Sequence, residues 1–343
     1  MTIFHSINHS KEVRTIMMDT VISTIAVMTS GGDSPGMNAA LRAVVRGANR
    51  YKLTAWGIYR GYQGLIEDKF IELDSEKVSN IVQRGGTILK SARSQEFRTK
   101  DGRAQAALNL RSKGIDALVV IGGDGTFRGA NLLSKEYGIR VIGIPATIDN
   151  DIIGTDETIG YDTALNTAIE AIDKIRDTAD AHERMFLVEV MGRDAGFIAL
   201  ETGIAVGAEL SLLPEELTSI SDIKTQLKDM LKEQKRSSLI VVAEGDETGG
   251  ALKLAEKIKD DFTKYDLRVC ILGHVQRGGS PSARDRVLAS RLGASAIKVL
   301  MEGHNEVMVG VVNNALKITP LRVAVAKKKG LDFGLIELAR MLR

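Results

Sequence analysis

The sequence has 343 residues, of which 44% are hydrophobic and 26% are charged, and its formal net charge is +2. A chain of this length exceeds the size at which a single hydrophobic core usually keeps growing, so we expect two packed domains. The composition is typical of a folded globular protein and not of a disordered one. Aromatic residues make up 4%, which with the small net charge argues against a nucleic-acid partner and predicts only local phosphate recognition.

The sequence also carries no pattern typical of a membrane or secreted protein. No stretch approaches the roughly 18 uninterrupted apolar residues of a membrane span, and the first twenty residues lack the apolar middle of a secretory signal. We therefore expect a cytoplasmic protein without a membrane partner. Residues 1–21 have little periodicity and are interpreted as an N-terminal extension, either a disordered arm or a misassigned start.

Short β-branched runs alternate with amphipathic stretches along the chain, which predicts an α/β fold. Continuous apolar runs are typical of parallel strands covered on both faces. Such strands are expected at residues 22–28, 117–121, 141–144, 186–190, 239–243 and 269–272. Apolar residues at three- and four-residue steps over 164–175 predict one helix, and further helices are expected at 222–235 and after Pro281.

The single cysteine, Cys270, lies in the apolar run at residues 267–272, which predicts a buried strand. One cysteine cannot form an intrachain disulfide, and no helix start or cationic cluster is evident beside it to activate the thiol. We interpret Cys270 as a small core side chain.

Candidate functional residues follow directly after the predicted strands. In open α/β sheets the ligand crevice lies beyond the carboxyl ends of the strands, so these loops are expected to converge on one site. No Pro- or Ser-rich linker marks a domain boundary. We place the division near Gly160 and expect the chain to cross back near His274.

Two glycine-rich loops favour phosphate binding. In the first, residues 29–38, the glycines let backbone N–H groups approach a phosphate at a helix start, although simple chain reversal is an equally common use. The Walker pattern with its Lys-Ser/Thr ending is absent, which excludes a conventional P-loop. The second, residues 121–126, flanks Asp124 with glycines, so its carboxylate could reach a magnesium ion beside a triphosphate. The competing interpretation is a tight turn capped by Asp124.

A further loop, residues 147–151, adds the carboxylates of Asp149 and Asp151 after another predicted strand. Phosphoryl transfer needs a base for the acceptor hydroxyl, metal ligands and positive charge. Arginine suits bidentate phosphate contacts, although any single arginine is more often a solvated surface residue. Glu244 could accept hydrogen bonds from sugar hydroxyls or could cap a helix.

From about Ile22 to the final helix, the sequence resembles the bacterial ATP-dependent type of the phosphofructokinase family. The resemblance is carried, in family order and spacing, by residues 29–33, 122–125, 145–151, 188–193 and 272–281. It implies two similar three-layer α/β domains with mainly parallel sheets and an active site in the cleft between them. It also implies transfer of a phosphoryl group from MgATP to the 1-hydroxyl of fructose 6-phosphate, which is the committed step of glycolysis and yields fructose 1,6-bisphosphate and ADP.

The resemblance also implies residue roles. Asp149 would be the base, with Thr147 and Asp151 flanking it, and Arg93 and Arg193 would face the transferring phosphoryl group. Asp124 would engage Mg²⁺. The ATP site would comprise Gly32, Arg93, Ser94, Gly123, Asp124, Gly125 and Thr126. The sugar-phosphate site would comprise Thr147, Ile148, Asp149, Arg184, Met191, Gly192, Arg193, Glu244, Arg268, His274, Val275, Gln276 and Arg277, with His274 and Arg277 on the 6-phosphate.

Family members build each site across a subunit interface. By resemblance, Arg184 and Arg268 would enter from a neighbouring subunit, and the working unit would be a homotetramer. The larger, ATP-binding domain is expected to comprise 22–159 and 276–328, and the smaller, fructose 6-phosphate-binding domain 160–275 and 329–343.

Two uncharged residues bear on the choice of phosphoryl donor. Relatives that use pyrophosphate carry Asp at the position of Gly125 and Lys at that of Ala146. An Asp at 125 would obstruct and repel the α-phosphate and ribose of a nucleotide, so ATP is favoured. ATP users commonly have Gly at position 146, and Ala146 is a mild departure.

The effector site departs more from the family. Residues matching its positions for ADP or phosphoenolpyruvate are Arg42, Arg46, Arg176, Glu209, Lys235 and Arg236. However, Ser75, Glu233 and Ser237 replace residues that are basic in the best-known members, and loss of cations weakens an anion site. We expect altered or absent effector regulation.

Three alternatives remain open from the sequence. They are a pyrophosphate-dependent phosphofructokinase, a diacylglycerol- or NAD-kinase relative, and a catalytically silent sugar-phosphate sensor. The kinase relatives share the Gly-Gly-Asp-Gly loop but lack the second acidic loop and the Met-Gly-Arg motif. A silent sensor would have lost the base, whereas Asp149, Asp124, Arg93 and Arg193 are all present.

Overall fold

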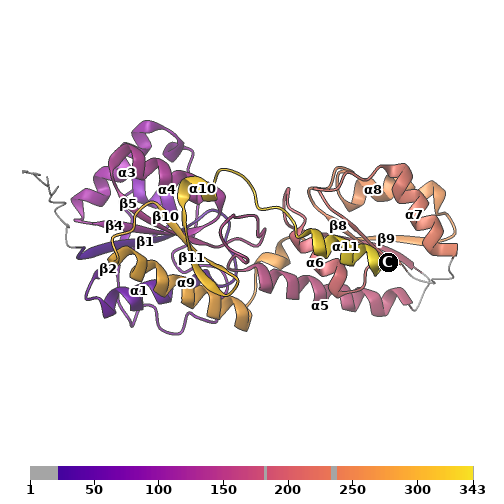
Figure 1. Cartoon of the computed structure of the whole chain (residues 1–343), viewed down its shortest axis with the longest axis horizontal. Coiled ribbons are helices and arrows are strands. Elements are labelled where there is room, and N and C mark those ends of the chain that lie inside the picture. Colours follow the sequence, from indigo (N-terminus) through magenta and orange to yellow (C-terminus); the bar gives the residue numbers. More distant parts are fainter. Residues whose placement is uncertain (1–21, 181–183, 233–237, 343) are drawn as a thin grey trace, which may run out of the picture.

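The protein is described by a computed structural model that covers residues 22–180, 184–232 and 238–342. Its described strands form two sheets, which lie toward opposite ends of an elongated molecule (Figure 1). The expected extension at residues 1–21 lies outside the described residues. In the described part of the chain, every helix is too short or too polar to cross a lipid bilayer.

The larger sheet has seven strands in the order β11-β10-β5-β4-β1-β2-β3. They are β1 (Thr24–Ser30), β2 (Thr54–Ile58), β3 (Phe70–Leu73), β4 (Ala117–Gly122), β5 (Arg140–Pro145), β10 (Val307–Val312) and β11 (Ala315–Pro320). The inner strands pair in parallel, and the edge strands β3 and β11 are antiparallel to their neighbours. Parallel strands covered on both faces explain the continuous apolar runs of β1, β4 and β5.

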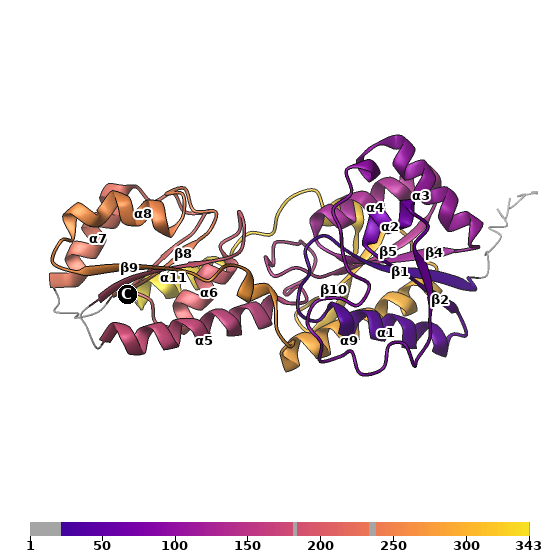
Figure 2. The same ribbon diagram turned by 180° about the vertical axis from the view of Figure 1, so that it is seen from behind.

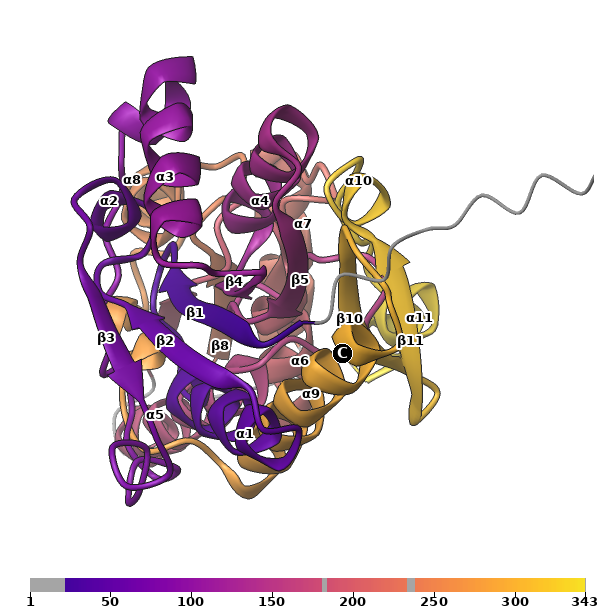
Figure 3. The same cartoon turned by 90° about the vertical axis from the view of Figure 1, so that its left-hand side faces the viewer.

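Helices cover both faces of this sheet (Figure 3). One face packs against α1 (Met37–Arg50) and α9 (Ala283–Met301), which also pack against each other. The other face carries α2 (Gly61–Ile66), α3 (Lys100–Ser112), α4 (Asp124–Tyr137) and α10 (Leu321–Ala324), with a short 3₁₀ turn at Glu96–Arg98.

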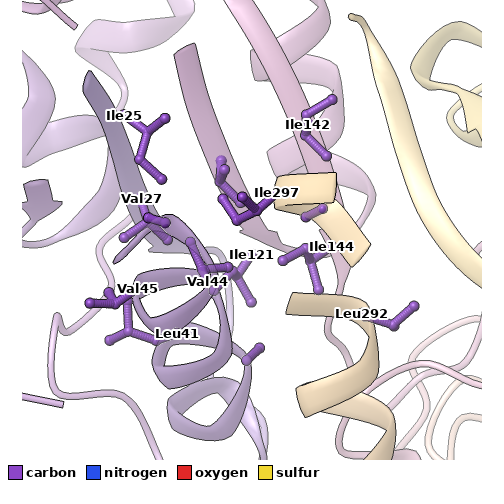
Figure 4. Close-up of a cluster of buried hydrophobic side chains, with 14 of the residues drawn as sticks. Ile25, Val27, Leu41, Val44, Val45, Ile121, Ile142, Ile144, Leu292 and Ile297 are labelled. Atoms are coloured by element: carbon purple, nitrogen blue, oxygen red, sulfur yellow. The ribbon is translucent and has the colours of Figure 1, made fainter. Parts of the chain in front are cut away.

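The core between the larger sheet and helices α1 and α9 is aliphatic. In Figure 4, Leu41 and Val44 of α1 and Ile297 of α9 lie beside Val27 and Ile121 of the sheet, and all are fully buried. Each fully buried aliphatic side chain of this size contributes roughly 1.5–3 kcal/mol relative to an exposed one. This packing holds the strands whose carboxyl ends carry the functional loops.

The smaller sheet has four parallel strands in the order β7-β8-β6-β9. They are β6 (Arg184–Val190), β7 (Leu210–Leu212), β8 (Ser238–Ala243) and β9 (Asp266–Ile271). One face packs on α5 (Tyr161–Asp180), α6 (Phe197–Ala205) and α11 (Phe333–Met341), and the other on α7 (Ile220–Lys232) and α8 (Ala251–Ile258), as Figure 2 shows from behind. A 3₁₀ turn at Lys259–Asp261 follows α8. Each sheet is therefore the middle of three layers, which confirms the predicted fold class.

The six predicted strands correspond to β1, β4, β5, β6, β8 and β9, and the predicted helices to α5, α7 and α9. The part of the predicted helix at 222–235 that follows Lys232 lies outside the described residues. Five strands were not predicted, namely β2, β3, β7, β10 and β11. Four of them are short or have mixed exposure: β7 has three residues, for example, and β11 is largely exposed. The fifth, β10, is a six-residue apolar run that the sequence analysis missed.

The prediction that Cys270 lies in a buried strand was wrong. Its strand, β9, is at the edge of the smaller sheet, and its residues are exposed or half-buried in the chain. Cys270 itself is half-buried, and Ile271 beside it is 46% exposed. An apolar run identifies a strand but does not distinguish an inner strand from an edge one. Partial burial raises the pKa of the Cys270 thiol.

The chain passes between the two sheets at three places. It enters the smaller sheet through α5, returns through α9, and crosses again between α10 and α11 (Figure 1). The first passage begins at Gly160, whose φ of +102° and close approach to Ser34 both require glycine. The exact domain boundaries stay a prediction.

Candidate active site

A cavity of about 800 Å³ lies where loops from both sheets converge. Its walls come mainly from the segments that follow β1, β3, β4, β5 and β6, with single residues from the segments after β9 and α10. The sequence-predicted residues that line it are Gly32, Arg93, Ser94, Gly123, Asp124, Gly125, Thr126, Thr147, Asp149, Asp151, Arg193 and Arg277. The carboxyl ends of parallel strands thus bring together side chains that are distant in sequence.

The Gly-Gly-Asp-Gly loop joins the end of β4 to the start of α4. Gly123 is the N-cap of this helix, so the helix directs free N–H groups and the positive end of its dipole at the cavity wall. The Thr126 hydroxyl donates to the Ser30 carbonyl at 3.0 Å, which fixes the loop against the end of β1. A Cβ built on Gly125 has no atom within 4 Å, so this position is open.

Asp124 is paired with a residue that the sequence did not single out. Arg128 lies one turn further along α4, and its Nε is 3.0 Å and 3.1 Å from the two Asp124 oxygens. Arg128 also lines the cavity. The i,i+4 spacing on α4 places Arg128 beside Asp124, and the sequence analysis missed this pair because it did not predict α4.

Asp149 is the most enclosed carboxylate of the cavity, with 9% of the residue exposed. Burial raises the pKa of Asp149, and the positive charges of Arg193 and Arg277 oppose the shift. Arg193 Nε lies 3.6 Å from Asp149 Oδ2. Asp149 is therefore a carboxylate that burial makes more basic and that a neighbouring guanidinium helps to keep ionised.

The backbone around Asp149 is held by neutral hydrogen bonds. The Asp149 N–H donates to the Thr147 hydroxyl at 3.2 Å. Asn150 has a φ of +53°, and its side-chain oxygen accepts from the Thr158 N–H at 3.1 Å. The Thr158 hydroxyl donates in turn to the Thr147 carbonyl at 2.6 Å. Asparagine tolerates left-handed backbone better than most residues, so this turn sets the direction of the loop.

The second carboxylate of this loop, Asp151, meets a lysine from far along the chain. Burial raises the pKa of Asp151, and Lys328 is the largest opposing influence. Lys328 Nζ lies 3.8 Å from Asp151 Oδ2. The sequence analysis did not identify Lys328, because a run of three lysines is more typical of a solvated surface.

Arg193 stands on a strained loop after β6. Its φ is +54°, a region that costs a non-glycine residue roughly 1–2 kcal/mol. Glu244 offsets this cost: its Oε1 accepts from the Gly192 N–H at 3.3 Å and from the Arg193 N–H at 2.7 Å. Gln276 accepts from the Met191 N–H at 3.4 Å. Glu244 and Gln276 therefore support the loop that presents Arg193.

Several predicted sugar-site residues lie beside the cavity without lining it in the described part of the chain. Gln276 is fully buried, Ile148 belongs to the core, and His274 and Val275 are exposed on a 3₁₀ turn at Gly273–Arg277. The set that the structure does not bring to the cavity wall is Ile148, Met191, Gly192, Glu244, His274, Val275 and Gln276.

Arg277 lies against the first glycine loop. Its Nη2 donates to the Asp33 carbonyl at 3.0 Å, and its Nε is 3.8 Å from Asp33 Oδ1. A Cβ on Gly32 would come within 1.7 Å of Arg277 Nη2. Glycine at position 32 thus allows the guanidinium to reach the cavity wall.

Arg184 and Arg268 are remote from the cavity of their own chain. They lie near the amino ends of β6 and β9, where Arg184 Nε and Arg268 Nη2 contact the same Asp266 oxygen at 3.0 Å and 2.9 Å. The residues that line the cavity follow the opposite end of β6, roughly 20 Å along a seven-residue strand. Within one chain these arginines cannot join the site.

The predicted effector residues fall into two groups. Arg42 and Arg46 are on α1 beside the larger sheet, whereas Arg176 on α5 and Glu209 before β7 belong to the smaller one. Arg176 donates to the Gly207 carbonyl at 3.2 Å and to Val206, and Glu209 accepts from the Leu239 N–H at 2.7 Å. Ser75 accepts from Asn49 at 2.9 Å. Lys235, Arg236, Glu233 and Ser237 lie outside the described residues.

Among the described residues, no three His, Cys, Asp or Glu side chains are grouped as a metal cage. Mg²⁺ in phosphoryl-transfer sites is usually held by one or two carboxylates together with the substrate phosphates. Asp124, partly exposed on the cavity wall, suits that mode.

Comparison with known proteins agrees with this geometry. Residues 24–300 match the phosphofructokinase family. The chain belongs to the phosphofructokinase family. It is 54% identical over 318 residues to an ATP-dependent 6-phosphofructokinase 1 of Thermus thermophilus, covering 93% of this chain and 98% of that protein. It is 51% identical over 321 residues to ATP-dependent 6-phosphofructokinase 2 of Bacteroides thetaiotaomicron, covering 94% and 98%.

Solved phosphofructokinases share the fold. The Pichia pastoris phosphofructokinase in the T-state superposes with a TM-score of 0.84 at 37% identity over 94% of this chain, which spans 36% of the yeast chain. A phosphofructokinase from Saccharomyces cerevisiae gives 0.83 at 38% identity over 93% of this chain and 46% of its own. A pyrophosphate-dependent phosphofructokinase from Marinobacter aquaeolei, at 21% identity with a TM-score of 0.79 over 91% of this chain and 86% of its own, shows the fold alone.

Proposed function

We propose that this phosphofructokinase transfers the γ-phosphoryl group of ATP to the 1-hydroxyl of fructose 6-phosphate, giving fructose 1,6-bisphosphate and ADP in glycolysis. The names and identity of the bacterial relatives support the reaction. The observation that carries it in this chain is the pair of the buried Asp149 carboxylate with the more exposed Arg193 guanidinium, which shares one cavity with the Gly-Gly-Asp-Gly helix start. These groups supply the base, the positive charge and the phosphate site that phosphoryl transfer needs.

Asp149 acts as the general base. It takes the proton of the sugar 1-hydroxyl as the oxygen attacks the phosphoryl group. Its burial supports this role, because a carboxylate whose pKa is raised toward the working pH is a better proton acceptor. Arg193 offsets the negative charge that gathers on the transferring group, and Arg93, exposed on the same cavity wall, assists it.

The donor binds along the wall formed by the loops after β1 and β4. Gly32, Ser94, Gly123, Gly125 and Thr126 surround its phosphates, and the start of α4 offers N–H groups to them. The open space at Gly125 supports ATP as the donor, since an Asp there would meet the nucleotide with steric bulk and like charge. Ala146 carries no charge that would favour pyrophosphate.

Asp124 would hold the Mg²⁺ that accompanies ATP. When bound, Mg²⁺ supplies positive charge that neutralises the phosphate oxygens. The pairing of Asp124 with Arg128 orients the carboxylate on the cavity wall.

The sugar phosphate binds toward the loops after β6, β8 and β9. Within the chain this site draws on Met191, Gly192, Glu244, His274, Val275, Gln276 and Arg277, together with Thr147 and Ile148. Arg184 and Arg268 would come from a neighbouring subunit, in a homotetramer whose sites are shared. Their position at the far ends of β6 and β9 supports this arrangement.

The remaining assignments are also proposals. ATP binds to the larger domain, which comprises residues 22–159 and 276–328. Fructose 6-phosphate binds to the smaller domain, which comprises residues 160–275 and 329–343. The protein works in the cytoplasm. Effectors such as ADP or phosphoenolpyruvate act weakly or not at all, because Ser75 supplies no charge to a site for anions. Titration with either effector checks this expectation, and full classical responses would contradict it.

A coupled assay of the purified protein with MgATP and fructose 6-phosphate tests the proposed function. We expect turnover in the wild type and a loss of about 10²–10⁴-fold in kcat for Asp149→Asn, the usual contribution of a general base. Asp194→Asn is a matched control, since Asp194 is an 84% exposed carboxylate on the same cavity wall. No turnover in the wild type, or equal kcat in the Asp149 and Asp194 variants, would reject the proposal.

A further inference from the structure

The segment between α10 and α11, residues 325–332, runs from the larger sheet to the helices of the smaller one (Figure 1). It is attached to the acidic loop on the way. The Lys329 N–H donates to the Asp151 carbonyl at 2.9 Å, and Lys329 Nζ donates to the Asp156 carbonyl. Lys329 Nζ also lies 4.9 Å from the centre of the Phe197 ring. These contacts fix the backbone directly after Lys328.

Lys328 lines the cavity between two carboxylates. Its Nζ lies 3.8 Å from Asp151 Oδ2 and 3.3 Å from Asp194 Oδ2. The side chain of Asp151 is 14% exposed and that of Asp194 is 84% exposed. Solvent weakens the pair with Asp194, even though it is the shorter one, whereas the pair with Asp151 is partly desolvated. The contact with Asp151 is therefore the one able to affect the site.

Without Lys328, the Asp151 carboxylate would interact with Arg193, the cation that pairs with Asp149. Arg193 Nε is 3.6 Å from Asp149, and the charge of Arg193 also acts on Asp151. Asp149 and Asp151 repel each other, since the charge of Asp151 raises the pKa of Asp149. Arg193 is the arginine whose charge acts on both carboxylates, so they would compete for it, and Lys328 gives Asp151 a second cation.

We infer that Lys328 is a positioning residue for phosphoryl transfer. It holds the Asp151 carboxylate, so that Arg193 can interact with Asp149 and with the transferring phosphoryl group. The inference rests on the proposed function. It assigns a role in the site to the segment that follows α10, which no sequence motif marks.

Steady-state kinetics of Lys328→Met test this inference. We expect kcat to fall by about tenfold, the effect of losing one partly desolvated ion pair, with KM for ATP changed by less than about twofold. Lys328→Arg keeps the charge and is expected to restore kcat to within about threefold of wild type. The control is Lys327→Met, an adjacent exposed lysine outside the cavity lining, which should match wild type.

A double-mutant cycle separates the two carboxylate partners. Because Lys328 acts through Asp151, adding Lys328→Met to Asp151→Asn should change kcat by less than about twofold. Asp194→Asn alone should not reproduce the loss, since that pair is solvated. Thermal unfolding of each variant checks for a general loss of folding. We expect the midpoint temperature of each variant to equal that of the wild type.

Three results would overturn the inference while the wild type remains active: a kcat of Lys328→Met equal to that of Lys327→Met, a full loss on adding Lys328→Met to Asp151→Asn, or an Asp194→Asn variant as slow as Lys328→Met. Failure of the proposed function would look different, because the wild type itself would not turn over.

Discussion

At the scale of single residues, the site contains three carboxylates, each of which pairs with a different cation and is buried to a different degree. Asp124 pairs with Arg128, Asp149 with Arg193 and Asp151 with Lys328. Asp149 is the most enclosed of the three, and the pKa of this carboxyl is raised. A carboxylate with these surroundings suits proton acceptance, whereas the half-exposed Asp124 suits a metal and phosphates.

The raised pKa of Asp149 predicts the acid limb of the activity profile. The base works only when ionised, so kcat/KM should fall as the pH drops through a midpoint above 3.8, the ordinary value for Asp. Arg193 opposes the shift, and Arg193→Met should move this midpoint to higher pH. The measurement is kcat/KM for fructose 6-phosphate against pH. A midpoint at or below 3.8, or one that Arg193→Met leaves in place, would contradict the assignment.

The contrast between Asp149 and its partners shows what the sequence could predict of the site. Many of the motif residues that follow strands line the cavity, as predicted, because each loop follows the carboxyl end of its own strand, whereas Met191, Glu244 and His274 lie beside it. Arg128 and Lys328 carry no motif. Arg128 stands four residues after Asp124 on α4, a helix that the sequence analysis did not predict, whereas Lys328 reaches the site through a chain crossing after α10 that local patterns do not determine.

At the scale of elements, the inner parallel strands β1, β4, β5, β6 and β8 were predictable because both faces are covered and their sequences are continuously apolar, whereas the inner strands β2 and β10 were missed. The edge strands β3 and β11 were not predictable, since exposure mixes polar residues into them. The same distinction explains Cys270, whose apolar run predicted an inner strand although β9 lies at an edge.

The junction of α5 and α9 gives a prediction for stability. The Asp285 carboxylate on α9 accepts from the Gly160 N–H at 2.7 Å, the Thr163 N–H at 2.8 Å and the Thr163 hydroxyl at 2.5 Å. Asp285→Asn leaves buried donors without an acceptor and should lower the free energy of unfolding by about 1–3 kcal/mol. Urea unfolding measures this change. Glu302→Gln, at the exposed other end of α9, is the control, and equal stability of the two variants would contradict the prediction.

The same carboxyl predicts a pH dependence of stability. Burial raises the pKa of Asp285 from 3.8 to about 6 in the folded protein. Between these values the unfolded chain has lost the proton and the folded chain keeps it, so this group's contribution to stability falls as the pH rises from 3.8 to 6. Asp285→Asn should remove that fall. An unchanged slope of unfolding free energy against pH would show that another group controls it.

At the scale of the whole molecule, Arg184 and Arg268 predict a shared site. Arg184 begins β6 and Arg268 lies in the first half of β9, and the cavity is reached from the carboxyl ends of these strands. Neither arginine lines the cavity of its own chain, and both are held by Asp266 at the start of β9. If the site needs them, a second subunit must supply them.

Hybrid enzymes test this sharing. Arg184→Ala and Asp149→Asn chains should each be nearly inactive alone. Co-expressed, they should form sites that take Asp149 from one chain and Arg184 from another, and random assembly predicts about a quarter of wild-type activity. Activity of the co-expressed mixture no greater than the sum of the separate variants would contradict sharing.

The central claim is that the Gly125 loop and Asp149 together transfer a phosphoryl group from ATP. The most direct test compares initial rates with fructose 6-phosphate and either MgATP or magnesium pyrophosphate, for the wild type and for Gly125→Asp. We predict that the wild type works with ATP at least about a hundredfold faster than with pyrophosphate, and that Gly125→Asp loses most of the ATP rate through steric and charge repulsion. A wild type that works faster with pyrophosphate, or a Gly125→Asp variant with the full ATP rate, would contradict the account.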